Sequence, residues 1–231
     1  DERGKGLGSI STDGGPGETC FTKGTKVKLY KGGTIAIEKL KKVVDSRPSE
    51  EIFGMTMMIS KGKTVLVADT NVTDFPSAEK LSNIATSCVR VSRLFGFDPK
   101  VAFLSHSTFG KPSTVRTKHV REAIELMKTK KIDFDYDGEM QPDVALNPEY
   151  KESYPFSKIV GSANILIMPA LHSASISVKL MKTFGGARLI GPLLIGLGLP
   201  IEIAPLRSSP SDILNLASIA AFSSKVIDYK S

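Results

Sequence analysis

Apolar residues recur along the chain with two spacings, one typical of helices and one typical of strands. Between Ser77 and Gly96 they return every three or four positions, which predicts a helix of about five turns. The stretches 51–59 and 64–69 are β-favouring runs joined by Ser-Lys-Gly-Lys, the length and chemistry of a hairpin. A shorter helical pattern over 34–45 predicts an amphipathic helix.

The middle of the chain repeats the order strand, polar loop, helix. A strand predicted over 101–104 is followed by a polar stretch and then by a helix for which Ser113 is the expected cap. A second strand over 133–137 is expected to break at Gly138, and a third over 164–168 leads into a helix from about Ser173.

The last third continues the alternation. Short buried strands are predicted over 189–197 and 201–204, and Ser209 with Asp212 predicts the start of a final helix. Strands that alternate with helices predict a layered α/β/α fold, and the single hairpin makes its sheet mixed but mostly parallel.

Composition narrows the class of protein. The chain has 231 residues, 41% of them hydrophobic, enough for a sizeable core. Its net charge of +7 favours anionic partners, yet the basic residues are spread along helix faces and aromatics make up only 7%, so phosphate-bearing small molecules are favoured over nucleic acid. Residues 1–26 are rich in glycine and predict a flexible arm without a regular element.

Two features of the sequence bear on the cellular location of the protein. No apolar run reaches the roughly 20 residues that cross a bilayer, so no membrane partner is expected. Cys20 and Cys88 have no metal-type spacing, which favours a reduced, cytoplasmic protein.

Polar side chains gather where predicted strands end, and ligands of open α/β sheets bind at the carboxyl ends of strands. We therefore expect one ligand-binding cleft. Its candidate residues are Ser105, Ser107, Thr108, Asp137, Glu139, Asn164 and Ser173.

Two other chemistries fit the residues less well. The run from Asp133 to Gly138 copies the first half of a calcium-binding loop, but Val144 stands where a bidentate Glu is needed, so no metal site is expected. Serines, histidines and aspartates invite a hydrolase triad, but there is no G-x-S-x-G motif and no spacing that pairs a base with a nucleophile.

Four segments together resemble the phosphate acetyl/butyryltransferase family. They are LSHST at 104–108, DGEMQPDVAL at 137–146, SANILIMP at 162–169, and the segment 185–200 with its GG, GP and GLGLP elements. The resemblance runs over about 34–222 and is most similar in detail to the C-terminal domain of bacterial hybrid NADP-dependent malic enzymes. It implies a two-lobed fold whose first lobe is incomplete here, with 1–33 as an atypical arm and 34–231 as the transferase-like domain. Within that domain, about 50–188 form the second lobe and 189–231 return to the first.

The family's reaction passes an acetyl group between phosphate and coenzyme A, which requires cations for the phosphate charge. True transferases carry a Ser-Arg pair after the GLxxP segment, and here Pro205 and Leu206 stand at that pair. Thr183 stands where the family has another Arg. Asp212 matches a catalytic Asp but is also explained as a helix cap. A one-residue shift brings Arg207 onto the Arg position, so it is a candidate phosphate-binding residue.

Three hypotheses remain open. The resemblance implies an acetyl-CoA-binding regulatory domain without transferase turnover, acting on an attached or associated malic enzyme catalytic domain. In that case NADP belongs only to the malic domain, acetyl-CoA or CoA is the ligand here, and no cofactor is expected in these residues. The alternatives are an active phosphate acetyltransferase and a structural oligomerisation module. Self-association into a homo-oligomer is expected because the family assembles through its second lobe.

Overall fold

The computed structural model describes residues 9–12, 15–22, 25–29, 46–47, 50–204 and 208–226. The chain divides into two compact units. We call Met57–Leu189 the central unit, and Asp1–Thr56 with Ile190–Ser231 the terminal unit. The helix predicted over 34–45 and the candidate Arg207 lie outside the described residues.

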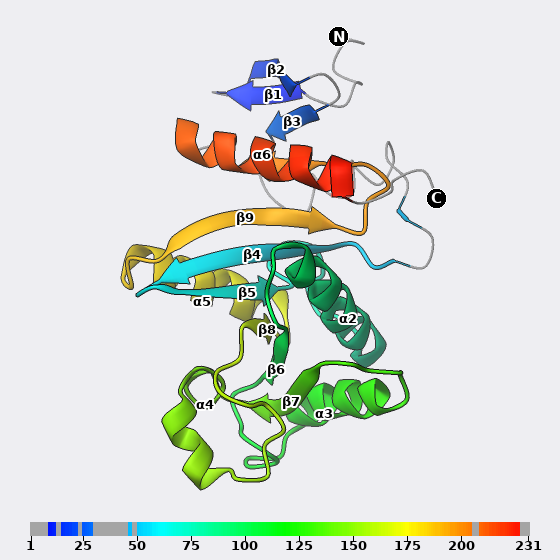
Figure 1. Ribbon diagram of the computed structural model, residues 1–231, viewed down its shortest axis with the longest axis vertical. Coiled ribbons are helices and arrows are strands. Elements are labelled where there is room, and N and C mark those ends of the chain that lie inside the picture. The colour runs from blue at the N-terminus through cyan, green and yellow to red at the C-terminus, as the bar shows by residue number, and fades with distance from the viewer. Residues whose placement is uncertain are drawn as a thin grey trace. The chain divides into compact units, whose positions relative to one another are not determined.

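The central unit is built on strands in the order β4-β5-β8-β6-β7 (Figure 1). Their bounds are Phe53–Ser60 for β4, Lys63–Ala68 for β5, Ile165–Ile167 for β8, Lys100–Leu104 for β6 and Asp135–Met140 for β7. The pairs β5–β8, β8–β6 and β6–β7 are all parallel. Lys61 and Gly62, with φ of 50° and 73°, turn β4 into β5, which confirms the predicted hairpin.

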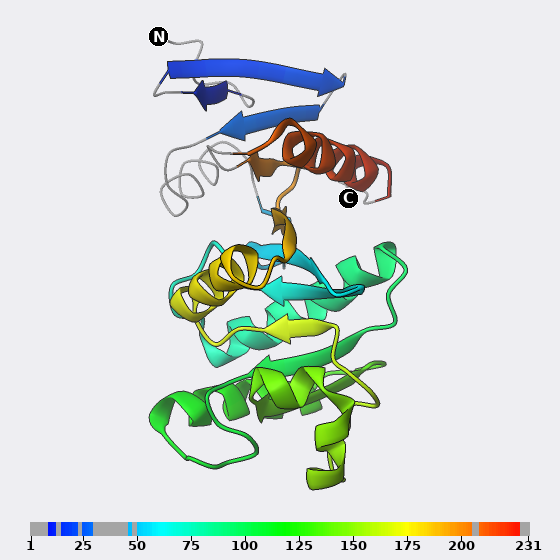
Figure 2. The same cartoon turned by 90° about the vertical axis from the view of Figure 1, so that its left-hand side faces the viewer.

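Helices cover both faces of these strands (Figure 2). Helices α2 (Ala78–Leu94) and α3 (Val115–Lys128) pack on one face. Helices α4 (Pro142–Leu146) and α5 (Leu171–Thr183) pack on the other, and the 3-10 helix η2 (Pro148–Ser153) follows α4. Alternation along β6 explains the two faces, since Ala102 and Leu104 join the core beneath α5 while Phe103 points toward α3. The predicted layered α/β/α fold with a mixed, mostly parallel sheet is confirmed.

Local hydrogen bonds set the helix starts. Ser77 caps α2, its side chain accepting from the N–H of Lys80, at the start of the predicted helical stretch. Helix α3 is capped by Thr114 and not by Ser113. The shift of one residue follows from Thr117, because its hydroxyl accepts from the N–H of Thr114 while Thr114 accepts from the N–H of Thr117, completing a reciprocal capping box.

The prediction that a strand ends at Gly138 is wrong. Strand β7 runs through Gly138 to Met140 and stays paired with β6. Gly138 has φ 146°, and a Cβ there would lie 2.6 Å from the carbonyl oxygen of Phe103. The glycine therefore serves the close approach of two strands and not a turn.

The terminal unit has its own strands, in the order β1-β2-β3-β10-β9. They are β1 (Ser9–Thr12), β2 (Gly15–Thr22), β3 (Thr25–Leu29), β9 (Arg188–Ile195) and β10 (Glu202–Ala204). Helix α6 (Pro210–Val226) packs on β3 and β10. The first 26 residues were expected to contain no regular element, yet they supply β1, β2 and the start of β3. Strand β3 pairs in parallel with β10, a partner far away in sequence that a glycine-rich local pattern does not reveal.

Candidate functional site

Parallel strands bring the carboxyl ends of β5, β8, β6 and β7 to one edge of the central unit. Asp69 follows β5, almost fully buried, and its carboxylate accepts the N–H groups of residues 71, 72 and 73 at 2.8–3.0 Å. Burial and the nearby Asp69 raise the pKa of the Cys88 thiol in α2 well above its ordinary value. The three hydrogen bonds to Asp69 show that the chain after β5 forms a structural turn.

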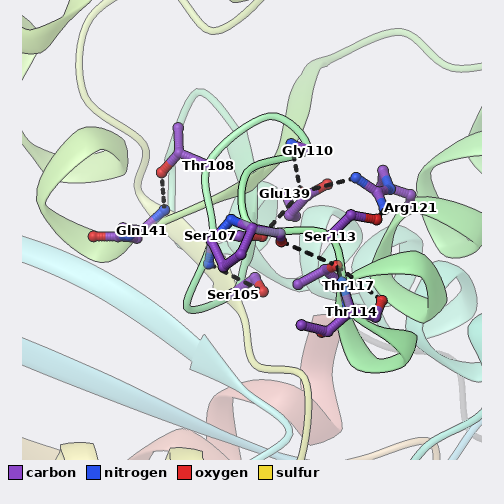
Figure 3. Close-up of polar contacts among 11 residues, drawn as sticks. Ser105, Ser107, Thr108, Gly110, Ser113, Thr114, Thr117, Arg121, Glu139 and Gln141 are labelled. Carbon is purple, nitrogen blue, oxygen red and sulfur yellow. Dashed lines mark hydrogen bonds and ion pairs between the residues drawn. The ribbon is translucent and has the colours of Figure 1, made fainter.

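Glu139 is the centre of the polar cluster at the ends of β6 and β7 (Figure 3). Its side chain is fully buried, and its Oε1 accepts the hydroxyl of Ser107 at 3.0 Å and the N–H of Gly110 at 2.7 Å. The main chain adds a further bond, because the N–H of Phe109 donates to the Glu139 carbonyl at 2.8 Å. One carboxylate thus holds the whole loop that follows β6.

Arg121 of α3 provides the counter-charge. Its Nη1 lies 3.4 Å from Glu139 Oε1, and its Nη2 donates to the hydroxyl of Ser113 at 2.9 Å. The second carboxylate oxygen of Glu139 is buried without a hydrogen-bond partner among the described residues. A buried acceptor in this state is costly unless a proton, water or ligand satisfies it, so Glu139 can accept one more donor.

The predicted residues Ser105 and Thr108 lie in the same cluster. The N–H of Ser105 donates to the carbonyl of Met140, and the Thr108 hydroxyl accepts from the N–H of Gln141 at 3.2 Å. The Gln141 side chain donates in turn to the carbonyl of His106 at 3.0 Å. Ser105, Ser107, Thr108 and Glu139 are therefore brought together as the sequence predicted.

Asp137 lies beside this cluster but has a structural task. It is buried, and its two oxygens accept the N–H of Gly138 at 2.9 Å and the N–H of Lys158 at 2.7 Å. Asp135, two residues earlier, accepts weakly from the N–H of Val160. Both carboxylates tie the segment near 160 to β7. Among the described residues no group of acidic, histidine and cysteine side chains could hold a metal ion.

Asn164 and Ser173 do not join the cluster. Asn164 precedes β8 at the amino end of the strands, where its side chain accepts the N–H of Lys100 at 2.8 Å and donates to the carbonyl of Asp98 at 2.6 Å. Sequence reasoning took it for a carboxyl-end residue because it assigned it to the strand itself. Ser173 lies in the first turn of α5, and its hydroxyl donates to the carbonyl of Ala170.

Asp212 belongs to the terminal unit and caps α6. Its carboxylate accepts the N–H of Ser209 at 2.9 Å, and its own N–H donates to the Ser209 hydroxyl at 3.2 Å. This reciprocal pair is the capping box that the sequence also predicted for Asp212.

A pocket of about 560 Å³ opens next to Thr108. The sequence analysis missed most of its wall, which comes from the loop after β6, from α4 and from the segment 150–156. Its lining residues are Thr108, Phe109, Lys111, Gln141, Asp143, Val144, Tyr150, Ser153, Tyr154 and Phe156. The available signal was the concentration of aromatic residues over 150–156, which follows neither a helical nor a strand period.

None of the described helices is both long enough and apolar enough to cross a membrane. The chain is similar to known proteins of two kinds. It is 44% identical over 194 residues to an NADP-dependent malic enzyme of Rhizobium meliloti, which covers 84% of this chain and 26% of that protein. It is 31% identical over 169 residues to a phosphate acetyltransferase of Bacillus subtilis, covering 73% of this chain and 52% of that protein.

The fold is also that of solved phosphotransacetylases. A phosphotransacetylase from Streptococcus pyogenes matches with a TM-score of 0.78 and 30% identity, over 85% of this chain and 62% of that one. The EutD phosphotransacetylase from Staphylococcus aureus matches with a TM-score of 0.76 and 28% identity, over the same shares. The chain spans about a quarter of the length of the malic enzymes that it matches.

Residues 32–221 match the phosphate acetyl/butaryl transferase family, which is most of the chain and includes the whole polar cluster around Glu139. This chain therefore belongs to the phosphate acetyl/butaryl transferase family.

Proposed function

We propose that the chain is the phosphate acetyltransferase-like regulatory part of an NADP-dependent malic enzyme, which binds acetyl-CoA as an allosteric effector and does not turn over acetyl phosphate. The similarity to malic enzymes supports the first half of this proposal, because the chain corresponds to only about a quarter of their length. A catalytic malic domain, with its NADP, belongs to the remainder in this proposal.

The hydrogen bonds within the polar cluster support the second half of the proposal, which is the lack of acetyl phosphate turnover. Ser107 is fully buried and its hydroxyl donates to Glu139, while Arg121 is engaged by Glu139 and Ser113. Groups so engaged hold a loop in place and are not presented to a phosphate. Transfer of an acetyl group to or from phosphate needs cations that meet the developing charge. Binding without turnover is the function that this arrangement supports.

The position of Thr183 agrees with this reading. It ends α5 with an exposed side chain, and by alignment from Gly191 it stands where active transferases carry an Arg. A neutral hydroxyl there removes one positive charge from the phosphate site.

Two measurements on the chain test the proposal together. Calorimetry should detect acetyl-CoA binding, and an assay of acetyl-CoA formation from acetyl phosphate and CoA should stay at background. Robust turnover would favour the active phosphate acetyltransferase, which the similarity to the Bacillus subtilis enzyme also supports. Absence of any CoA affinity, together with assembly, would favour the oligomerisation module.

Regulation needs a malic domain and is tested in a chimera. The corresponding part of the Rhizobium meliloti malic enzyme would be replaced with this chain, and NADP reduction by malate measured with and without acetyl-CoA. Acetyl-CoA should lower the rate of the chimera, whereas the 231-residue chain alone should reduce no NADP. An unchanged rate in a chimera that binds acetyl-CoA would remove the regulatory role.

A further inference from the structure

Part of the wall of the 560 Å³ pocket is a cluster of three aromatic rings, those of Phe109, Tyr154 and Phe156. The ring centroid of Phe109 lies 4.8 Å from that of Phe156 and 5.4 Å from that of Tyr154, and the latter two are 6.2 Å apart. Phe156 lines the pocket and is 63% exposed although it packs on its neighbours, so a large part of its aromatic surface remains accessible. A pocket of this volume accommodates a ligand of nucleoside size.

The chain adopts an unfavourable backbone to place one of these rings. Thr108 and Lys111 pair as a β-bridge, with Phe109 and Gly110 between them at φ of 48° and 95°. Such a turn favours Asn-Gly or Gly-Gly, and a bulky side chain at its first position is strained. Strain of this kind persists only where the surroundings enforce it, and it is concentrated at functional sites.

Glu139 is what enforces the turn. Its main-chain carbonyl accepts the N–H of Phe109, and its Oε1 accepts the N–H of Gly110. The buried network that the sequence marked as a site therefore also supports the aromatic wall, one residue away. Glu139 acts here as a positioning residue.

The polar groups of the pocket are of two kinds. Lys111 supplies a positive charge at an exposed position, and Asp143 supplies an exposed carboxylate. A planar base that stacks on the rings could donate its exocyclic amino group to Asp143, while a phosphate on its ribose would pair with Lys111.

We infer that this pocket holds the adenine nucleotide end of a CoA thioester, with the base on the wall of Phe109, Tyr154 and Phe156 and a phosphate on Lys111. The inference rests on the proposed acetyl-CoA binding and deepens it. A quaternary ammonium ligand fits less well, because ring centroids 4.8–6.2 Å apart leave no room for a cation between the rings. Lys111 would also repel it.

The test measures binding by calorimetry to the 231-residue chain, with adenosine 3′,5′-bisphosphate and acetyl-CoA as separate probes. Phe156→Leu keeps apolar bulk but removes the ring, and Lys111→Gln removes the charge. Matched controls are Phe75→Leu, another half-exposed phenylalanine of the central unit, and Lys118→Gln, an exposed lysine of α3, neither of which lines the pocket. Both pocket variants should weaken both probes by about tenfold or more, and both controls by less than about twofold.

The outcomes separate this inference from the proposed function. Tight acetyl-CoA binding that is unchanged in Phe156→Leu and Lys111→Gln would overturn the nucleotide site and leave acetyl-CoA binding in place. Binding of the bisphosphate that depends on both residues, without any binding of acetyl-CoA, would keep the nucleotide site and overturn the proposed effector. Failure of both probes on the wild-type chain would overturn both.

Discussion

The hydroxyl of Ser107 donates to the carboxylate of Glu139 over 3.0 Å, with both side chains fully buried. The two residues are 32 positions apart in the chain and come from the ends of neighbouring strands, β6 and β7. Their bond fixes the loop that carries Thr108 and Phe109 to the sheet edge, so it joins the polar cluster to the pocket beside it.

Replacing Glu139 with Gln should destabilise the chain. The amide loses the charge that Arg121 pairs with, and it places an NH₂ group where the second carboxylate oxygen is already buried without a described partner. An unsatisfied buried polar group costs about 1–3 kcal/mol, so the free energy of unfolding in urea should fall by about that amount. Glu122→Gln, on the exposed side of α3, is the matched control and should change it by less than about 0.5 kcal/mol. Equal losses in the two variants would show that the network is not structurally important.

Gly138→Ala should be more damaging than an alanine at another glycine with positive φ. The new Cβ would lie 2.6 Å from the Phe103 carbonyl oxygen and 3.0 Å from the Phe103 Cβ. Overpacking adds about 1–3 kcal/mol to the backbone strain. Gly62→Ala is the control, since φ is 73° but no atom lies within 4 Å of the added methyl. Thermal unfolding of both variants measures the difference, and a loss at Gly62 as large as at Gly138 would contradict the steric argument.

The stability of the chain should depend on pH through Glu202. This side chain is buried in β10, and burial raises its pKa well above the ordinary value, although the N–H of Leu194 donates to it and acts in the opposite direction. Because the folded state holds the proton more tightly than the unfolded state, the contribution of Glu202 is complete below about pH 4.3, the usual pKa of glutamate, and is lost as pH rises toward the raised value.

Glu202→Gln should therefore flatten the decline of unfolding free energy with rising pH above about 4.3. Urea unfolding at a series of pH values measures the slope, with Glu149→Gln, an exposed residue of η2, as the control. A variant whose slope equals that of the wild type would mean that Glu202 is not responsible.

Arg207→Ala should weaken acetyl-CoA binding by about tenfold, because a charged contact to phosphate contributes about 1.5–3 kcal/mol. The thermal midpoint of the unliganded chain should not change. Calorimetry compares this variant with Lys111→Gln. A loss at Lys111 alone would confine phosphate recognition to the central unit.

Self-association remains a prediction, and α5 offers a surface for it. Ile176, Leu180 and Phe184 follow one another every four residues, and each is more than half exposed. Light scattering at micromolar concentration should detect an oligomer in the wild type, and Leu180→Asp should shift it toward the monomer. Val160→Asp, also more than half exposed but on another segment, should leave the oligomer intact. A wild-type monomer would end this prediction.

Local pattern was sufficient for elements whose signals lie within a few residues. The period of α2, the hairpin after β4 and the Ser209–Asp212 box of α6 were all predicted, because each depends on hydrogen bonds or packing between near neighbours. The motifs around Ser105 and Glu139 likewise identified the polar cluster, since successive strands of a parallel sheet end at a common edge.

Non-local pairing decided the rest. Gly138 continues a strand because β6 runs beside it, and Asn164 lies at the opposite end of the strands from Ser107. Strands β1 and β2 of the first 26 residues pair with each other, β2 pairs with β3, and β3 pairs with β10. The pocket wall joins Phe109 to Tyr154 and Phe156 across 45 positions of sequence or more. The amino-acid sequence by itself determined the family, the start of α6 and which polar residues gather at the ends of β6 and β7. The tertiary structure decided which of those groups are engaged and where a ring-lined cavity opens, because both depend on contacts between segments that no local period specifies.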